Sequence, residues 1–86
     1  MTFTYTGEEN EHGEPHGQGV AEYANGDRYE GQWKDGEYHG QGVYEYADGT
    51  RYEGQWKDGE QGQGVYEYAN GDRYEGQWKD GNPTNH

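Results

Sequence analysis

The chain has 86 residues with 18 acidic against 6 basic side chains, a net charge of −12, and it contains neither cysteine nor serine. These counts exclude a disulfide framework, a thiolate metal site and a serine nucleophile, and the negative charge disfavours nucleic acids and anionic membranes as partners. Leucine and isoleucine are also absent, so three Trp, ten Tyr and one Phe must supply the hydrophobic core in place of aliphatic side chains.

Residues 1–16 predict a degenerate first repeat that caps an array. The triplet that begins at Tyr5 matches the triplet that begins at Tyr29 in a later copy, but Glu9 stands where that copy has Trp33. No stretch resembles a signal peptide or a membrane span, because no apolar run is longer than three residues. We therefore expect a soluble protein, located by default in the cytoplasm.

The segment from Glu11 to His16 has two interpretations. Its two imidazoles and its carboxylates are groups that bind transition metals. The favoured interpretation is a solvated loop at the capped end, and we expect neither a metal nor a cofactor.

Three copies of one nonapeptide, RYEGQWKDG, dominate the remaining sequence. They span residues 28–36, 51–59 and 73–81, and a GQGV tetrapeptide lies upstream of each copy. This periodicity predicts a single repeat domain over residues 1–86. Its parts are the cap at 1–16, repeats at 17–39, 40–61 and 62–81, and a C-terminal tail at 82–86.

Each copy alternates with a period of two, which predicts β-strands rather than helices. Tyr29, Gly31 and Trp33 share one face, and the intervening Glu, Gln and Lys share the other. Asp-Gly and Asn-Gly pairs between these segments are strong turn signals, because both residue types tolerate positive φ. The sequence therefore predicts an antiparallel meander. It has an aromatic face of Tyr, Trp and Gly and a charged face of Glu–Arg and Gln–Gln pairs with a thin stripe of Val.

The register of the first complete hairpin depends on where its loop lies. If residues 35–38 form the loop, Tyr29 lies opposite Tyr44 and Trp33 lies opposite Gly40. Glycines then line the aromatic face, and Gly31 and Gly42 lie opposite each other. We expect an indole ring to lie flat across the neighbouring strand there, since no Cβ blocks it.

The next loop is predicted at residues 47–49. Its last residue, a glycine, would adopt the left-handed conformation of a bulged turn. Tyr44 would then face Tyr52, and Glu45 would face Arg51. The same residue types therefore recur on the same face along the array.

The chain resembles the MORN repeat family, whose pattern is close to YEGxWxxGxxHGxGxYxYxDG. Residues 29–33, 39–42 and 44–49 fit this pattern closely, and residues 52–71 and 74–81 fit it again. The resemblance implies an all-β fold: an elongated, twisted antiparallel meander of β-hairpins that forms a single-layer sheet. It also implies a role in protein contacts or self-association. The lipid role often proposed for the family is disfavoured here by the negative charge.

Internal identity in the array is high. Residues 22–36 and 67–81 are the same fifteen residues. Because natural repeats drift apart, this identity favours an engineered or idealised repeat protein, and a recent duplication is the alternative.

The aromatic face provides the candidate binding residues. They are Tyr29, Trp33, Tyr44, Tyr46, Tyr52, Trp56, Tyr66, Tyr68, Tyr74 and Trp78. These rings act either as core or as a recognition groove for a helix or peptide, and core is the favoured interpretation because a sheet must bury one face. A carbohydrate or a quaternary ammonium ligand stacked on the rings is a further alternative.

The sequence offers no enzyme active site. Glu22, Glu45 and Glu67 recur at one position, each facing an arginine, whereas catalysis needs one set of carboxyl groups with different pKa values. We therefore expect a structural scaffold that self-associates as a homodimer through its aromatic face. The alternative is an adaptor that binds a partner protein or peptide, and no nucleic acid or membrane partner is expected.

Overall fold

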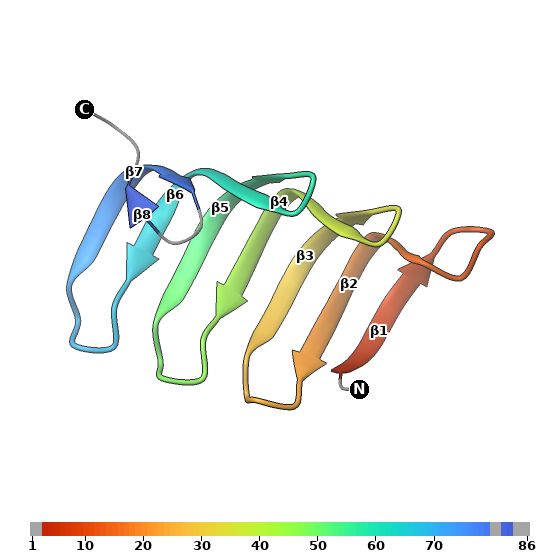
Figure 1. The fold of residues 1–86 in the computed structure, drawn as a ribbon, viewed down its shortest axis with the longest axis horizontal. Helices are drawn as coiled ribbons and strands as arrows, with labels where there is room; N and C mark the ends of the chain where they lie inside the picture. The colour runs from red at the N-terminus through yellow and green to blue at the C-terminus, as the bar shows by residue number, and fades with distance from the viewer. Residues whose placement is uncertain (1–2, 80–81, 84–86) are drawn as a thin grey trace.

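The computed structural model describes residues 3–79 and 82–83. Its strands, in chain order, are β1 (Phe3–Glu9), β2 (Pro15–Tyr23), β3 (Arg28–Lys34), β4 (Glu37–Glu45), β5 (Arg51–Lys57), β6 (Glu60–Glu67), β7 (Arg73–Lys79) and β8 (Asn82–Pro83). Each strand pairs antiparallel with the next, so spatial order equals sequence order (Figure 1). The all-β meander in one open layer is therefore confirmed.

The sheet is elongated across its strands. The molecule measures 40 × 25 × 17 Å, and in Figure 1 the hairpins follow one another along the longest axis. No second layer packs on either face of this sheet within the described residues, so the core must form on one face of the sheet alone. The described part of the chain includes no helix long and apolar enough to span a membrane.

Two-residue turns connect the strands at one end of the sheet. Asp35 and Gly36 have φ values of 49° and 88°, and Asp58 and Gly59 repeat this with 52° and 83°. Positive φ at both central residues matches the right-handed twist of a hairpin, and aspartate and glycine tolerate it best.

This tight turn makes the predicted loop over residues 35–38 wrong. β4 already begins at Glu37, and Tyr38 rather than Gly40 lies opposite Trp33. The register then shifts by a bulge in β4, where Gly40 adopts a φ of 69°. Beyond the bulge, the predicted pairs of Tyr29 with Tyr44 and of Gly31 with Gly42 are confirmed.

Longer turns connect the strands at the opposite end. Between β4 and β5, Gly49 has a φ of 96°, and its N–H donates to the carbonyl of Tyr46 at 3.0 Å. The pairs Tyr44–Tyr52 and Glu45–Arg51 follow, as predicted.

The ends of the chain are described in part. Asn82 and Pro83, at the start of the predicted tail, pair with Lys79 and Trp78. Residues 1–2 of the predicted cap, 80–81 of the third repeat and 84–86 of the tail lie outside the described residues.

Candidate binding face

The aromatic face holds the buried core of the protein. Along β3 and β5, buried and exposed residues alternate strictly: Tyr, Gly and Trp are buried, while Glu, Gln and Lys are exposed. The buried residues are Ala21, Tyr29, Trp33, Tyr52, Trp56, Tyr66 and Trp78. Aromatic rings therefore replace the missing aliphatic residues as the core.

The core tyrosines of β3 and β5, Tyr29 and Tyr52, lie along their own strands and over the strand that follows. The hydroxyl of Tyr29 donates to the carbonyl of Gln32 at 2.7 Å, which carries the ring over Gly31 and across to Gly42. A Cβ added to Gly42 would lie 2.1 Å from the Tyr29 hydroxyl oxygen. Tyr52 repeats this arrangement over Gly64. Glycine is therefore needed on both strands beneath the phenol ring.

Each core tryptophan contacts the strand that precedes it. The Nε1–H group of Trp33 donates to the carbonyl of Gly19 at 3.1 Å, and those of Trp56 and Trp78 donate to equivalent carbonyls at 3.2 and 3.0 Å. The indole N–H groups are thus satisfied inside the core. The expectation that an indole lies over the paired glycines is wrong, because the phenol ring of Tyr29 takes that place.

The rings contact one another across the repeat boundary. Tyr29 stacks on Tyr38 with ring centroids 3.9 Å apart, and both meet Trp33 and Trp56 edge to face at 4.9–5.5 Å. Such contacts add to the free energy gained from burial. The core of one repeat is therefore completed by the next repeat.

The ten predicted binding residues divide by exposure. Tyr29, Trp33, Tyr52, Trp56, Tyr66 and Trp78 are buried, and Tyr44, Tyr46 and Tyr68 are half-buried. Tyr74 is exposed. All ten lie on one face, but only the three half-buried tyrosines and Tyr74 present substantial ring surface to a ligand.

Sequence reasoning missed three half-buried tyrosines on this face, Tyr5, Tyr23 and Tyr38. Tyr23 holds the same place in its repeat as Tyr46 and Tyr68, so its signal was present in the sequence. The sequence predicts a loop at Tyr38, because the tight turn and the bulge that bring this residue onto the face leave no mark in the residue pattern.

Two adjoining hollows follow the aromatic face. One is lined chiefly by Phe3, Pro15, Tyr23 and Trp33, and the other by Tyr44, Tyr46 and Trp56, with Tyr38 lining both. Together they form a shallow groove along the array with phenol groups on its walls.

Hydroxyl groups on this face bond to each other and to Asp27. The Tyr44 hydroxyl donates to Asp27 Oδ2 at 2.8 Å, and the hydroxyls of Tyr46 and Tyr66 lie 3.1 Å apart. The hydroxyls of Tyr23 and Tyr38 also contact each other. The groove walls are therefore polar at the tips of the rings.

Burial raises the pKa of the core tyrosines above the usual value. For Tyr38 the loss of solvent is the largest cause, followed by the Tyr23 hydroxyl, and for Tyr44 it is followed by the Asp27 carboxylate. The pKa values of Tyr29, Tyr52 and Tyr66 are raised by burial too. These phenols therefore stay neutral at physiological pH and act as hydrogen-bond partners only.

The opposite face carries the charges. Arg28 contacts carboxylates of Glu22, Glu30 and Glu45 at 3.1–3.7 Å, which confirms the predicted Glu–Arg pairs. Gln–Gln pairs lie beside them, and in one such pair the two amide groups bond at 2.7 Å. All of these groups are exposed or half-exposed, so each ion pair contributes about 0–1 kcal/mol.

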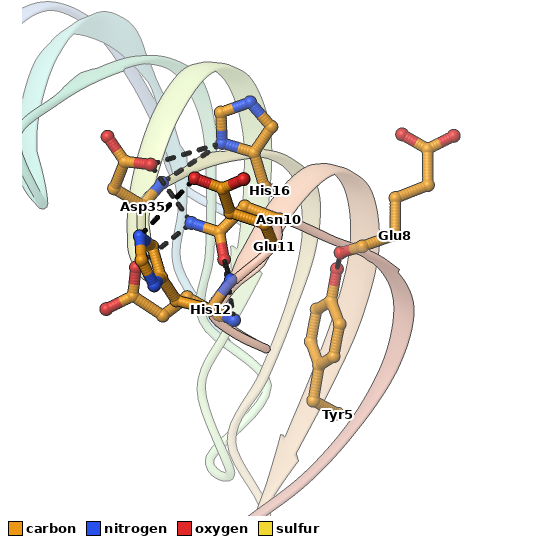
Figure 2. A network of polar contacts seen from close by, with 8 residues as sticks. Tyr5, Glu8, Asn10, Glu11, His12, His16 and Asp35 are labelled. Atoms are coloured by element: carbon orange, nitrogen blue, oxygen red, sulfur yellow. Dashed lines mark hydrogen bonds and ion pairs between the residues drawn. The ribbon is translucent and has the colours of Figure 1, made fainter.

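The turn between β1 and β2 is tied together by Asn10 (Figure 2), and the predicted loop is wrong at its end, because Pro15 and His16 belong to β2. Its side-chain oxygen accepts from the N–H groups of His12 and Glu14, and its Nδ2 donates to Asp35 in the next turn at 3.1 Å. Asp35 N–H in turn donates to His16 Nδ1. No group of three or more His, Asp or Glu within residues 3–79 and 82–83 is placed to hold a metal ion.

Sequence comparison identifies the repeats. The MORN repeat profile matches residues 11–28, 29–51, 52–73 and 74–86, so that three of the matches begin at the tyrosine of the core strands. The predicted division at 17–39, 40–61 and 62–81 uses another phase and stays a prediction. A comparison with curated proteins finds no significant match. Because the profile covers well over half of the sequence, and because its tyrosine, glycine and tryptophan positions build the core described above, the chain belongs to the MORN repeat family.

Proposed function

We propose that the protein is a non-enzymatic structural scaffold that self-associates by placing its aromatic face against the same face of a second copy. One observation supports this proposal above the others. Along the regular strands, the aromatic face carries Tyr, Trp, Gly and Ala, while Arg, Glu and Lys lie on the other face. Over these strands two copies can therefore meet without bringing carboxylates together, although each copy has a net charge of −12 and Glu37 and Glu60 line the two hollows of the face.

The half-buried rings are the contact groups in this proposal. Trp33 and Trp56 are already covered by other rings and have little surface left to bury. Tyr44 and Tyr46 retain exposed ring surface along the groove, and Tyr68 retains it elsewhere on the aromatic face. Tyrosine is enriched in protein interfaces because it combines a large apolar ring with a hydroxyl group.

Multi-angle light scattering tests the proposal with a matched pair of variants. Tyr46→Glu places a negative charge on the aromatic face, and Gln41→Glu places the same charge on the exposed opposite face. We expect the unmodified chain and Gln41→Glu to have about twice the single-chain mass of 9.8 kDa, and Tyr46→Glu to have the single-chain mass. A single-chain mass for the unmodified protein at high concentration would contradict self-association.

The groove favours a second candidate function. Its two hollows adjoin at Tyr38 and run along the face, which suits a helix or an extended peptide of another protein. An adaptor of this kind would be a monomer whose Tyr44 and Tyr46 are accessible to a collisional quencher. The same light-scattering samples therefore separate the adaptor from the self-associating scaffold.

An engineered origin and a cytoplasmic location of the protein are also part of the proposal. The identity of residues 22–36 with residues 67–81 supports an engineered or idealised array, with recent duplication as the alternative. A cytoplasmic location stays a prediction from the sequence.

A further inference from the structure

The second hollow of the aromatic face, called here the Trp56 hollow, is bordered by four aromatic rings. Tyr38 and Tyr44 come from β4, Tyr46 follows that strand, and Trp56 comes from β5. Neighbouring ring centroids are 4.7–6.2 Å apart, and the rings are inclined at 38–78° to one another. The hollow has a volume of about 190 Å³, which leaves room for a small organic cation. The rings therefore border this space from several sides instead of forming one flat stack.

The charged groups around the Trp56 hollow are negative. Glu60 lines the hollow, and the Asp27 carboxylate accepts a hydrogen bond from the hydroxyl of Tyr44 at 2.8 Å. Among the described residues that line the hollow there is neither a lysine nor an arginine. The whole chain also has a net charge of −12. The electrostatic potential at the hollow therefore favours a cation over an anion.

The phenol hydroxyl groups at the hollow already have hydrogen-bond partners. Tyr44 donates to Asp27, and the hydroxyls of Tyr38 and Tyr46 each contact another phenol hydroxyl. A primary ammonium ion has three N–H donors that need acceptors when they leave water, and Glu60 is the one carboxylate in the described lining. A quaternary ammonium ion has no N–H group, and aromatic rings within about 6 Å of it attract its charge. The lining therefore suits a quaternary ammonium ion better.

The bond to Asp27 distinguishes Tyr44 from its counterparts in the neighbouring repeats. The preceding repeat has Ala21 at this position, and the following repeat has Tyr66, whose hydroxyl contacts neutral side chains. A phenol that donates to a carboxylate gains electron density in its ring, which strengthens the attraction between the ring and a cation. The Trp56 hollow therefore has a feature that the same position in the other repeats lacks.

We propose that the Trp56 hollow binds the trimethylammonium group of a small soluble cation. The cation lies against Tyr44 and the neighbouring rings, Glu60 supplies a negative charge at the rim, and Asp27 acts through the Tyr44 hydroxyl. A peptide is the poorer occupant, because β4, β5 and β6 are paired along both edges and offer no free backbone groups to a bound chain. This site does not depend on the self-association proposed above, although the two use the same face.

Titration of the isotope-labelled chain with choline tests the site by NMR, at a protein concentration where light scattering gives the single-chain mass. If the chain stays dimeric on dilution, Tyr68→Glu replaces it, because Tyr68 does not line the hollow. We expect a saturable shift of the Trp56 Nε1–H signal, larger than any shift at Trp33 or Trp78. The neutral isostere 3,3-dimethylbutan-1-ol should bind at least tenfold more weakly, because it has the shape of choline without the charge.

Matched substitutions identify the groups that hold the cation. Glu60→Gln should weaken choline binding severalfold, whereas Glu37→Gln, the same change one repeat earlier, should leave it unchanged because Glu37 lines the other hollow. Tyr44→Phe and Asp27→Asn should each weaken binding severalfold. The double variant should bind no more weakly than either single variant, because Asp27 acts through the Tyr44 hydroxyl. Dispersed backbone signals show that each variant is folded, and Glu60→Gln changes only an exposed side chain.

Several outcomes would overturn the proposal: no saturable shift at tens of millimolar choline, equal binding of the neutral alcohol, or equal shifts at Trp33 and Trp56. Tighter binding of a trimethyllysine peptide than of choline would overturn the assignment to a small cation. Because the titration uses single chains, its failure has no bearing on the mass of the unmodified chain measured by light scattering. The proposed site and the proposed self-association therefore fail separately.

Discussion

Gly62 and Gly64 lie two residues apart on β6 but meet different surroundings. A Cβ added to Gly64 would lie 2.5 Å from the hydroxyl oxygen of Tyr52, whereas one added to Gly62 would meet nothing nearer than 3.6 Å. Gly62 is also outside the left-handed region of φ. The two glycines therefore separate the effect of ring packing from the general effect of a glycine in a strand.

This difference predicts opposite effects of the same substitution. Gly64→Ala should lower the free energy of unfolding by about 1–3 kcal/mol, because the Tyr52 ring must move off its backbone contacts. Gly62→Ala should leave it unchanged or raise it by up to about 1 kcal/mol, because the unfolded chain loses freedom. Urea unfolding followed by tryptophan fluorescence measures both. Equal losses would mean that the phenol ring does not need the bare backbone.

Sequence alone identified which residues share a face but not which ring covers the glycines. Alternation placed Tyr29, Gly31 and Trp33 together, and this is confirmed. The period of two says nothing about whether a side chain runs along its own strand or across to a neighbour. The hydrogen bonds of Tyr29 forward to Gln32 and of Trp33 back to Gly19 decide that direction.

For the strands and turns, the positions of the turns could be predicted from the sequence better than the lengths of the strands. Asp-Gly pairs gave the positions of the turns, and the left-handed Gly49 is confirmed. The bulge in β4 could not be predicted, because glycine adopts both extended and left-handed backbone, so the sequence does not say that Gly40 rather than Gly42 takes a positive φ. The tight turn and this bulge together place Tyr38 beside Trp33 and against the core, where the sequence predicts a loop.

The turn between β2 and β3 also forms hydrogen bonds with the next hairpin, at the turn between β4 and β5. Asp27, in the turn between β2 and β3, accepts from the backbone N–H of Ala47 at 2.8 Å and from the hydroxyl of Tyr44. Asp72 holds the same place in the third such turn, but its carboxylate bonds only to Asn70 among the described residues. The contribution of the two bonds that Asp27 makes to the next hairpin can therefore be measured by comparing the two aspartates.

Asp27→Ala should lower the free energy of unfolding by about 1–2 kcal/mol, because the half-buried Tyr44 hydroxyl loses a charged acceptor. Asp72→Ala should change it by no more than about 0.5 kcal/mol. Chemical denaturation of both variants under identical conditions makes the comparison. If Asp72→Ala lowers the free energy of unfolding as much as Asp27→Ala, the loss comes from the turn itself and not from the bonds of Asp27 to the next hairpin.

For the whole molecule, the buried tyrosines make stability depend on alkaline pH. Burial raises the pKa of Tyr29, Tyr52 and Tyr66 in the folded chain, while in the unfolded chain each phenol has a pKa near 10. Below about pH 10 the folded and the unfolded chain both keep the phenol protons, so the stabilising contribution of the buried tyrosines is fully present. Above about pH 10 the unfolded chain loses protons that the folded chain retains, so stability falls.

We therefore expect the urea midpoint to stay constant from about pH 8 to pH 9.5 and to fall steeply above about pH 10. Each buried tyrosine adds at most about 1.4 kcal/mol per pH unit to this loss. The variant Tyr66→Phe lacks one titrating phenol and should show a shallower decline. A midpoint that does not change up to about pH 11 would show that the phenols are accessible to water in the folded state.

The single layer also has a consequence for size. The size of a two-layered domain is limited by the interior volume that its surface can enclose. In this sheet each added hairpin brings its own aromatic rings, which cover the backbone of the neighbouring hairpin. Strands are spaced about 4.8 Å apart, so each hairpin lengthens the particle by about 10 Å at constant width. In an array of this kind the contour length is set by the number of repeats, and an added repeat leaves the packing of the others unchanged.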